Sequence, residues 1–166
     1  MKINNNEREI LEILEKDARF TAADISKMTG LNEENVQAMI DKLEEARVLV
    51  HYTSLVDWSK VEDDQRVTAM IDVKVTPKRG VGFHETADRI SRFSEVSSVY
   101  LMSGAYDLSV TVEGKSMNEV ARFVSEKLSV LEEVISTTTH FQLKKYKHDG
   151  RMFEEKQTDS RIVVSP

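Results

Sequence analysis

The sequence predicts an α+β protein with two domains, a helical one followed by one that alternates strands and helices. Three observations support this prediction. Thr21–Arg47 has the apolar spacing of two helices on either side of Gly30. From Val48 onwards β-branched and aromatic residues replace the helical pattern. Residues 67–146 then follow the order strand, helix, strand, strand, helix, strand.

The first helix is expected over residues 4–16, with Asn5 or Asn6 as its N-cap. Its apolar residues recur at helical spacing and should form one buried stripe. The residues of this stripe are Ile10, Leu11, Ile13 and Leu14.

Two further helices follow. Thr21 and Asp24 have the spacing of a capping box, and Gly30 stands where a short helix needs a left-handed exit. Asn32 is the expected cap of the next helix. The predicted apolar faces are Ile25, Met28 and Leu31, and then Val36, Met39, Ile40 and Leu43. The pattern is typical of a DNA-binding helix-turn-helix. It is equally compatible with an ordinary helical hairpin.

The segment Val48–Val56 is β-branched, aromatic and apolar, which predicts a strand. A strand directly after such a helical pair indicates the wing of a winged helix-turn-helix, or a segment that leads out of the domain. We therefore expect a winged helix-turn-helix domain over residues 1–57 and a polar, acidic linker over residues 58–66.

The second domain is expected over residues 67–146. Its predicted strands are Val67–Val75, Val96–Ser103, Tyr106–Val112 and Val134–Tyr146, and its predicted helices are Gly82–Phe93 and Ser116–Leu131. Gly104-Ala105 is the expected tight turn. This β-α-β-β-α-β order is that of a ferredoxin-like domain, an antiparallel sheet with two helices on one face. Residues 147–166 are expected to be an extension, in which Arg161–Val164 forms either a fifth strand or a frayed tail.

Composition excludes several classes of protein. The 166 residues are 40% hydrophobic and 31% charged, which is typical of a globular chain. There is no cysteine, which excludes disulfides and thiolate sites and is consistent with the cytoplasm. No run of about 18 apolar residues and no signal-peptide core are present, so no membrane association is expected. The four histidines are scattered and no nucleotide-binding motif occurs. Neither catalysis nor a metal or other cofactor is therefore expected.

Short pieces along the chain match one family in order and spacing. In the first half they are Glu9-Ile10-Leu11, Leu14, Asp17-x-Arg19, Ile25-Ser26, Gly30-Leu31, Val36, Ile40, Leu43-Glu44, Val48 and Tyr52. In the second half they are Val99, Ser103-Gly104-Ala105-Tyr106-Asp107 and Val134-Ile135-Ser136-Thr137-Thr138-Thr139. Nearly from end to end, the chain resembles the Lrp/AsnC (feast-or-famine) transcriptional regulators.

The resemblance implies a regulator whose first domain binds double-stranded DNA. Its second domain would form dimers, assemble them into larger rings and bind a small effector, commonly an amino acid. In this family the effector lies near the turn between the second and third strands, at contacts between dimers.

The residues of that turn suggest how an amino acid would be held. Gly104 lets backbone amides approach a carboxylate, and Asp107 offers a negative partner for an α-ammonium group. Hydroxyls on the last strand would add hydrogen bonds. The predicted effector-binding residues are Ser103, Gly104, Ala105, Tyr106, Asp107, Thr137 and Thr139. Without the resemblance, the same turn is adequately explained as a good β-hairpin turn.

The predicted DNA-binding residues are Asn32, Gln37, Ala38, Asp41, Lys42, Arg47 and His51. Gln37 is suited to adenine and Asn32 to a base or a phosphate. However, residues 1–60 hold 8 Lys and Arg against 12 Asp and Glu, a net charge of −4. Phosphate contacts supply most non-specific affinity, so a single domain should bind weakly. The alternative function is a ligand-binding or co-regulatory assembly protein with weakened DNA binding.

Dimer formation is also expected on physical grounds. A sheet with helices on one face leaves its other face to be covered. Tyr100, Met102 and Val110, or their neighbours, are expected on that open face and are too apolar for solvent. Pairing of two such faces predicts a two-fold homodimer. Further assembly into multimers is what the family resemblance implies.

Overall fold

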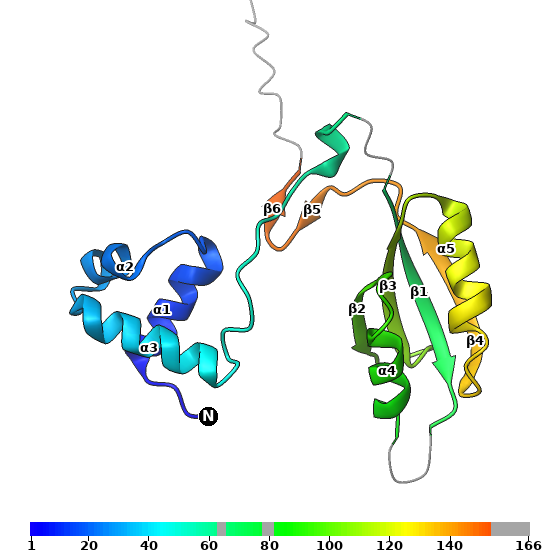
Figure 1. Ribbon diagram of the computed structural model, residues 1–166, viewed down its shortest axis with the longest axis horizontal. Coiled ribbons are helices and arrows are strands. Elements are labelled where there is room, and N and C mark those ends of the chain that lie inside the picture. The colour runs from blue at the N-terminus through cyan, green and yellow to red at the C-terminus, as the bar shows by residue number, and fades with distance from the viewer. Residues whose placement is uncertain (63–65, 78–81, 154–166) are drawn as a thin grey trace, which may run out of the picture. The chain divides into compact units, whose positions relative to one another are not determined.

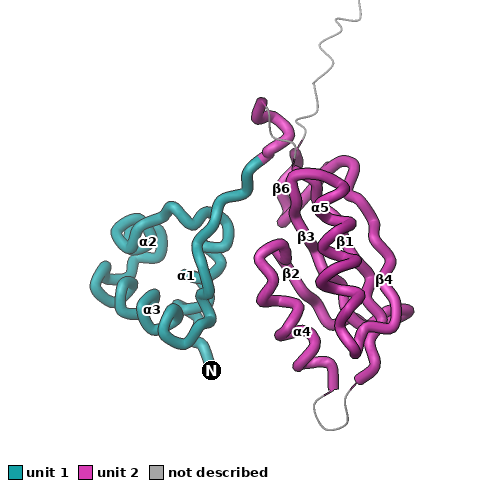
Figure 2. The backbone as a smooth tube through the Cα atoms, turned by 45° about the vertical axis from the view of Figure 1, so that its right-hand side comes forward, with its two compact units in different colours: residues 1–56 teal, residues 57–166 magenta. Residues whose placement is uncertain are grey.

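The computed structural model describes residues 1–62, 66–77 and 82–153. The chain divides into two compact units, residues 1–56 and residues 57–166 (Figures 1 and 2). The first unit is helical, and the second contains the sheet. This matches the predicted α+β class.

Three helices form the first unit: α1 (Asn5–Lys16), α2 (Ala22–Thr29) and α3 (Glu33–Glu45). Helix α2 begins with the predicted capping box of Thr21 and Asp24 and ends at Gly30, whose φ of 73° is left-handed. Asn32 caps α3, as predicted. The predicted N-cap of α1, Asn5 or Asn6, was wrong by one or two residues. The cap is Asn4, which forms a capping box with Glu7.

One apolar cluster joins the three helices. It consists of Ile10, Ile13, Leu14, Ile25, Val36 and Ile40. Met28, predicted on the buried face of α2, is instead 55% exposed. Helix α2 therefore contributes only Ile25 to the buried residues of this cluster, and α1 and α3 supply the others.

The strand predicted over Val48–Val56 is not formed. The backbone N–H groups of Val48 and Leu49 donate to the carbonyl of Leu43 and close the end of α3. Residues 50–57 have no regular secondary structure, and the side chain of Val50 is 66% exposed. A strand needs a neighbour for its hydrogen bonds, and no described segment of this chain pairs with these residues.

The second unit contains a four-stranded antiparallel sheet. Its strands are β1 (Val67–Val75), β2 (Val96–Leu101), β3 (Leu108–Gly114) and β4 (Val134–Phe141), in the order β2-β3-β1-β4. Helices α4 (His84–Ser91) and α5 (Met117–Phe123) complete the β-α-β-β-α-β order, and α5 continues as a π-helical turn over Val124–Leu128. Ahead of the sheet, a single 3₁₀ turn covers Trp58–Lys60.

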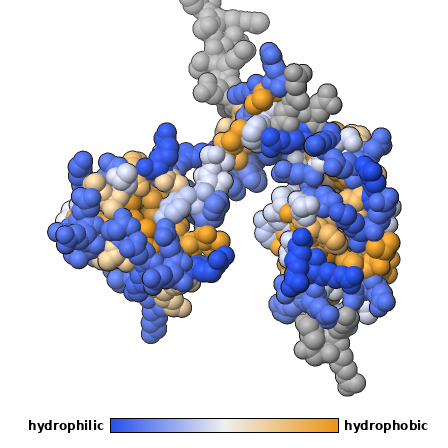
Figure 3. Space-filling view, in the orientation of Figure 1, coloured by the Kyte–Doolittle hydropathy of each residue, from blue (hydrophilic) through white to orange (hydrophobic). Residues whose placement is uncertain are grey.

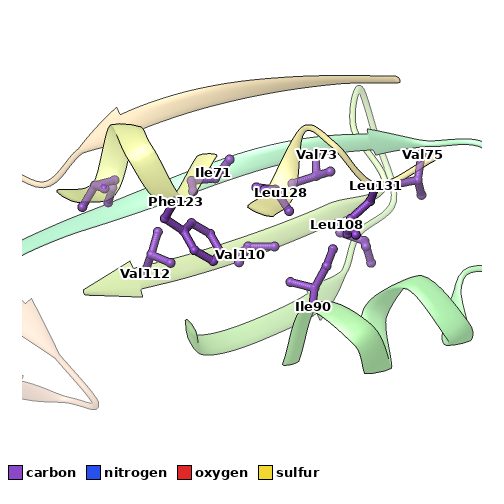
Figure 4. Close-up of a cluster of buried hydrophobic side chains, with 12 residues drawn as sticks. Ile71, Val73, Val75, Ile90, Leu108, Val110, Val112, Phe123, Leu128 and Leu131 are labelled. Atoms are coloured by element: carbon purple, nitrogen blue, oxygen red, sulfur yellow. The ribbon is translucent and has the colours of Figure 1, made fainter. Parts of the chain in front are cut away.

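The core of this unit lies between the helices and one face of the sheet. Figure 4 shows Ile90 of α4 and Phe123 of α5 pointing at Val110 and its neighbours on the strands. The core consists of Ala69, Ile71, Val73, Val75, Ile90, Leu108, Val110, Val112, Val120, Phe123, Leu128 and Leu131. Val110 is fully buried, so its expected place on the open face was wrong. Its strand partners Ile71 and Val99 lie on the same, helix-covered face.

A small hairpin follows the sheet, formed by β5 (Lys147–His148) and β6 (Arg151–Met152). Asp149 and Gly150 both have positive φ, 44° and 75°, as a two-residue type I′ turn requires. This hairpin was not predicted. The candidate fifth strand at Arg161–Val164 lies outside the described residues.

Candidate nucleic-acid interface and effector site

The exposed surface of α3 is where the predicted DNA contacts lie. Asn32, Gln37, Ala38 and Asp41 are all exposed. The Asn32 Oδ1 atom accepts the backbone N–H of Glu34 at 2.8 Å, which fixes the start of the helix. The Gln37 Nε2 atom donates to Asp41 Oδ1 at 2.7 Å. Asp41, one helical turn away, therefore already orients the Gln37 amide that is predicted to contact a base. The same Asp41 carboxylate would repel DNA phosphates.

Lys42 is part of an ion pair between helices. Its Nζ atom lies 2.6 Å from Glu7 Oε1, while Glu7 Oε2 accepts the backbone N–H of Asn4 at 2.8 Å. Glu7 is only 1% exposed. Its pKa is lowered from the ordinary value of 4.5, first by the Lys42 hydrogen bond and then by the bond from Asn4. Lys42 thus ties α3 to the start of α1, and its charge is already compensated.

Arg47 and His51 follow α3 and are exposed. Arg47 has a left-handed φ of 52° at the helix exit. Beyond it, the Tyr52 hydroxyl donates to Glu44 Oε1 at 2.7 Å. Burial, followed by the Glu44 carboxylate, raises the pKa of Tyr52 to about 12. Tyr52 therefore stays protonated and holds the segment that carries His51 against the last turn of α3.

The charge around α3 remains acidic in the folded unit. Hydrophilic residues cover most of the visible face of residues 1–56 in Figure 3. The exposed acidic side chains of α3 are Glu33, Glu34, Asp41, Glu44 and Glu45. Lys42, the one basic residue within α3, is paired with Glu7, and Arg47 follows the helix. Helix α3 itself therefore carries little of the positive charge that phosphate contacts require.

The predicted effector loop is longer than a tight turn. Strand β2 ends at Leu101 and β3 begins at Leu108, so six residues connect them. The Met102 N–H donates to the Asp107 carbonyl at 2.8 Å and closes the loop. Ser103, Gly104 and Ala105 are exposed, and Tyr106 is half-buried. Gly104 has a φ of 148°, a conformation that a side chain would strain.

Asp107 is held at the end of β1. Its backbone N–H donates to the Val73 carbonyl at 3.0 Å, and its Oδ2 atom accepts the Val75 N–H at 2.9 Å. Oδ1 has no hydrogen-bond partner among the described residues. One oxygen of a half-buried carboxylate thus positions the loop, and the other remains available to a cationic group.

The two predicted threonines lie differently with respect to this loop. Val73 pairs with both Leu108 and Thr137, so Thr137 is on the same rung of the sheet as the residue after Asp107. Thr139 pairs with Ile71, two residues farther along, which is about 7 Å. Both threonines share the helix-covered face with their valine and isoleucine partners. The structure thus places Thr137 at the loop end of the sheet and Thr139 away from it.

No metal site accompanies these residues. Within the described ranges, no group of three or more histidine, aspartate or glutamate side chains is arranged to hold an ion. Across the same ranges, no helix is long and apolar enough to cross a membrane.

A helix-turn-helix unit joined to a ferredoxin-like sheet is the architecture of a class of DNA-binding transcriptional regulators. Residues 3–50 match the family model of a winged helix-turn-helix DNA-binding domain. Residues 68–152 match that of the Lrp/AsnC ligand binding domain. The chain belongs to the Lrp/AsnC family of transcriptional regulators.

Individual relatives agree with this assignment. The chain is 60% identical over 166 residues to the uncharacterized HTH-type transcriptional regulator YugG of Bacillus subtilis, covering 100% of this chain and 100% of YugG. It is 29% identical to the HTH-type transcriptional regulator FL11 of Pyrococcus furiosus, covering 87% of this chain and 92% of FL11.

Two solved structures show the same fold. Escherichia coli AsnC has a TM-score of 0.68 at 22% identity, over 89% of this chain and 97% of AsnC. The regulator NMB0573 of Neisseria meningitidis, solved as a complex with L-Met, has a TM-score of 0.71 at 22% identity, over 89% and 94% of the two chains.

Proposed function

We propose that this regulator binds specific DNA sequences and that a small effector, an amino acid, changes its binding. The observation that carries the proposal is the loop of residues 102–107, which contains an exposed glycine, Gly104, and the half-buried Asp107 carboxylate. An amino acid needs one spot for its carboxylate and one for its ammonium group. The backbone of Ser103–Ala105 offers N–H groups for the first, and Asp107 Oδ1 offers an acceptor for the second. The L-Met complex of the Neisseria regulator supports this class of effector.

The protein is further proposed to act as a homodimer or a multimer of dimers. Met70 and Tyr100 lie on the open face of the sheet and are 48% and 59% exposed. Beside them, His140 Nε2 lies 3.0 Å from Asp72 Oδ2. An apolar sheet face with a local polar pair is suited to packing against a second copy. A regulator that binds chromosomal DNA must share a compartment with it. The proposed location is therefore the cytoplasm.

One observation favours a second candidate, a ligand-binding or co-regulatory assembly protein with weakened DNA binding. The exposed face of α3 is rich in carboxylates, and Lys42 is paired with Glu7. In that case, DNA contact would depend on a more basic partner subunit.

Substitution of Asp107 by Asn tests the effector site. Asn keeps an oxygen acceptor for the Val75 N–H and removes the charge offered to an ammonium group. Loss of one charge-assisted hydrogen bond should weaken amino-acid binding by about 10- to 100-fold. The measurement is a thermal-shift screen of the twenty amino acids on the wild type, followed by calorimetry of the best ligand on both proteins.

Asp88→Asn is the matched control, because Asp88 is an exposed carboxylate on α4. It should leave the dissociation constant unchanged. Equal affinity of the Asp107→Asn variant and the wild type would reject the proposed role of Asp107.

A further inference from the structure

His140 and Asp72 form a close pair on the open face of the sheet. The His140 Nε2 atom lies 3.0 Å from Asp72 Oδ2, between the edge strand β4 and its neighbour β1. Ile71 and Val73, on either side of Asp72 along β1, belong to the helix-covered core, so Asp72 points to the opposite face. The pair therefore lies on the surface that is proposed to pack against a second copy.

Asp72 lies in the central part of that surface. In the strand order β2-β3-β1-β4, β1 is an inner strand, and Asp72 is flanked by Ser109 of β3 and Thr138 of β4. The side chains of His140 and Asp72 are 58% and 25% exposed, so water reaches both. Two such faces packed about a two-fold axis near the centre of the sheet would each bring this pair into the contact and remove that water.

The charge of the open face depends on the protonation of His140. On this face of the four described strands, the other ionisable side chains are Asp72 and Lys74 of β1, Glu113 of β3 and Tyr100 of β2. Tyrosine carries no charge near neutral pH. Two acids and one lysine give the face a net charge of −1 while His140 is neutral. With His140 protonated, the net charge of the face is zero.

Packing of two such faces favours the protonated form of His140. While His140 is neutral, both faces carry negative charge, and an uncompensated carboxylate enters a contact from which water is removed. Once His140 is protonated, the imidazolium compensates Asp72 through a charge-assisted hydrogen bond. The packed form therefore binds the proton more tightly than the single chain, so association strengthens as the pH falls. Histidine side chains change charge between about pH 5 and 8.

We propose that the His140–Asp72 pair is a pH-sensitive element of the contact between subunits, which strengthens self-association when His140 gains a proton. The inference rests on the proposed dimer through the open face. It adds a second signal, the proton, to the amino-acid effector. Because several weak helix-turn-helix units gain affinity for DNA only when they are assembled, DNA binding should follow the same pH dependence.

The test is the dissociation constant of the dimer of the full chain, measured by sedimentation of a dilution series at constant ionic strength. For the wild type, this constant should rise by about 10- to 100-fold from about pH 6 to about pH 8, because two protons are lost per dimer.

Two substitutions separate the charge of the pair from its hydrogen bond, because they are expected to act in opposite directions. His140→Gln keeps a donor for Asp72 but cannot gain a proton, so its dimer should be as weak in mild acid as the wild-type dimer in mild base. Asp72→Asn removes the acid, so its dimer should be tighter than the wild-type dimer in mild base and should not strengthen in acid.

His84→Gln is the matched control. His84 is an exposed histidine on α4, and the helices cover the opposite face of the sheet. This variant should keep the pH dependence of the wild type.

A dissociation constant that does not change with pH, or a pH dependence that survives in His140→Gln, would overturn the role of the pair while leaving the dimer intact. Weaker dimers in both His140→Gln and Asp72→Asn would show that the hydrogen bond is only structural, and would also overturn it. Loss of the pH dependence in His84→Gln would do the same by showing an effect of overall charge. A wild type that stays a single chain at every concentration would overturn both the proposed dimer and its pH dependence.

Discussion

At the scale of residues, Glu7 links the sequence pattern to the stability of the DNA-binding unit. It closes the capping box of α1 and receives the ammonium group of Lys42 from α3. The spacing of Asn4 and Glu7 is a capping-box signal, but three consecutive asparagines left the cap ambiguous. The ion pair joins residues 35 positions apart. Local spacing cannot predict such a pair, because it exists only after the helices pack.

The pH dependence of this contact can be tested with Glu7→Gln. The pKa of Glu7 is lower in the folded unit than its ordinary value of 4.5, so the folded state binds the proton less tightly than the unfolded state. The stabilisation that the charged Glu7 carboxylate gives is complete at pH values above its ordinary pKa of 4.5. It is lost as the pH falls through the lowered pKa of the folded unit. Because Gln resembles the protonated acid, the variant should melt below the wild type at pH 7, and the difference should narrow in acid.

Thermal unfolding followed by circular dichroism at neutral and acid pH gives this comparison. Glu9→Gln, an exposed carboxylate on the same helix, is the control and should melt like the wild type at both. If the difference in melting temperature between Glu7→Gln and the wild type stays constant from neutral pH into acid, the proposed role of the Glu7 charge is contradicted.

At the scale of elements, the sequence predicted helices and sheet strands well where the pattern and the local signals agreed. Strand β1 begins and ends at the predicted residues, and α2 has the predicted cap and the predicted exit at Gly30. The turn between β2 and β3 was less predictable. Its length depends on the Met102–Asp107 closure and on Asp107 binding β1, which are contacts between separate segments.

The errors have physical causes. Val48–Val56 has strand-forming residues, but strand propensity does not supply a hydrogen-bonding partner. Val110 was placed on the wrong face because a one-residue error in strand phase reverses every side chain. The Asp149-Gly150 pair is a strong hairpin signal that was overlooked within a polar stretch. The predicted DNA and effector residues themselves stay predictions.

The open face of the sheet gives a prediction about assembly. Tyr100→Glu would place a charge in the middle of the proposed interface between subunits, where an unpaired charge is costly to bury. The variant should therefore elute as a single chain where the wild type forms a dimer or larger species. Size-exclusion chromatography with light scattering measures this mass.

Met117→Glu is the control, because Met117 is an exposed apolar residue on α5 and away from the open face. It should keep the wild-type mass. Retention of the wild-type mass by Tyr100→Glu would exclude this face as the main contact between subunits.

At the scale of the whole molecule, the two candidate sites lie in separate units. The helix-turn-helix belongs to residues 1–56, and the effector loop belongs to the sheet unit. For an effector to change DNA affinity, it must bind the DNA-competent form and another form unequally. Assembly supplies such a difference if the loop lies at contacts between dimers. Multiple weak helix-turn-helix units would then gain or lose joint access to DNA.

The most direct test of the central claim is DNA binding by the full chain with and without an amino acid. Polarisation on its own upstream duplex should show binding at about 50 mM salt and a steep loss towards about 200 mM. One amino acid identified by the thermal-shift screen should change the affinity by about 5- to 150-fold. Absence of binding at the lower salt concentration would contradict DNA-binding regulation. Binding that no amino acid alters would contradict the effector mechanism.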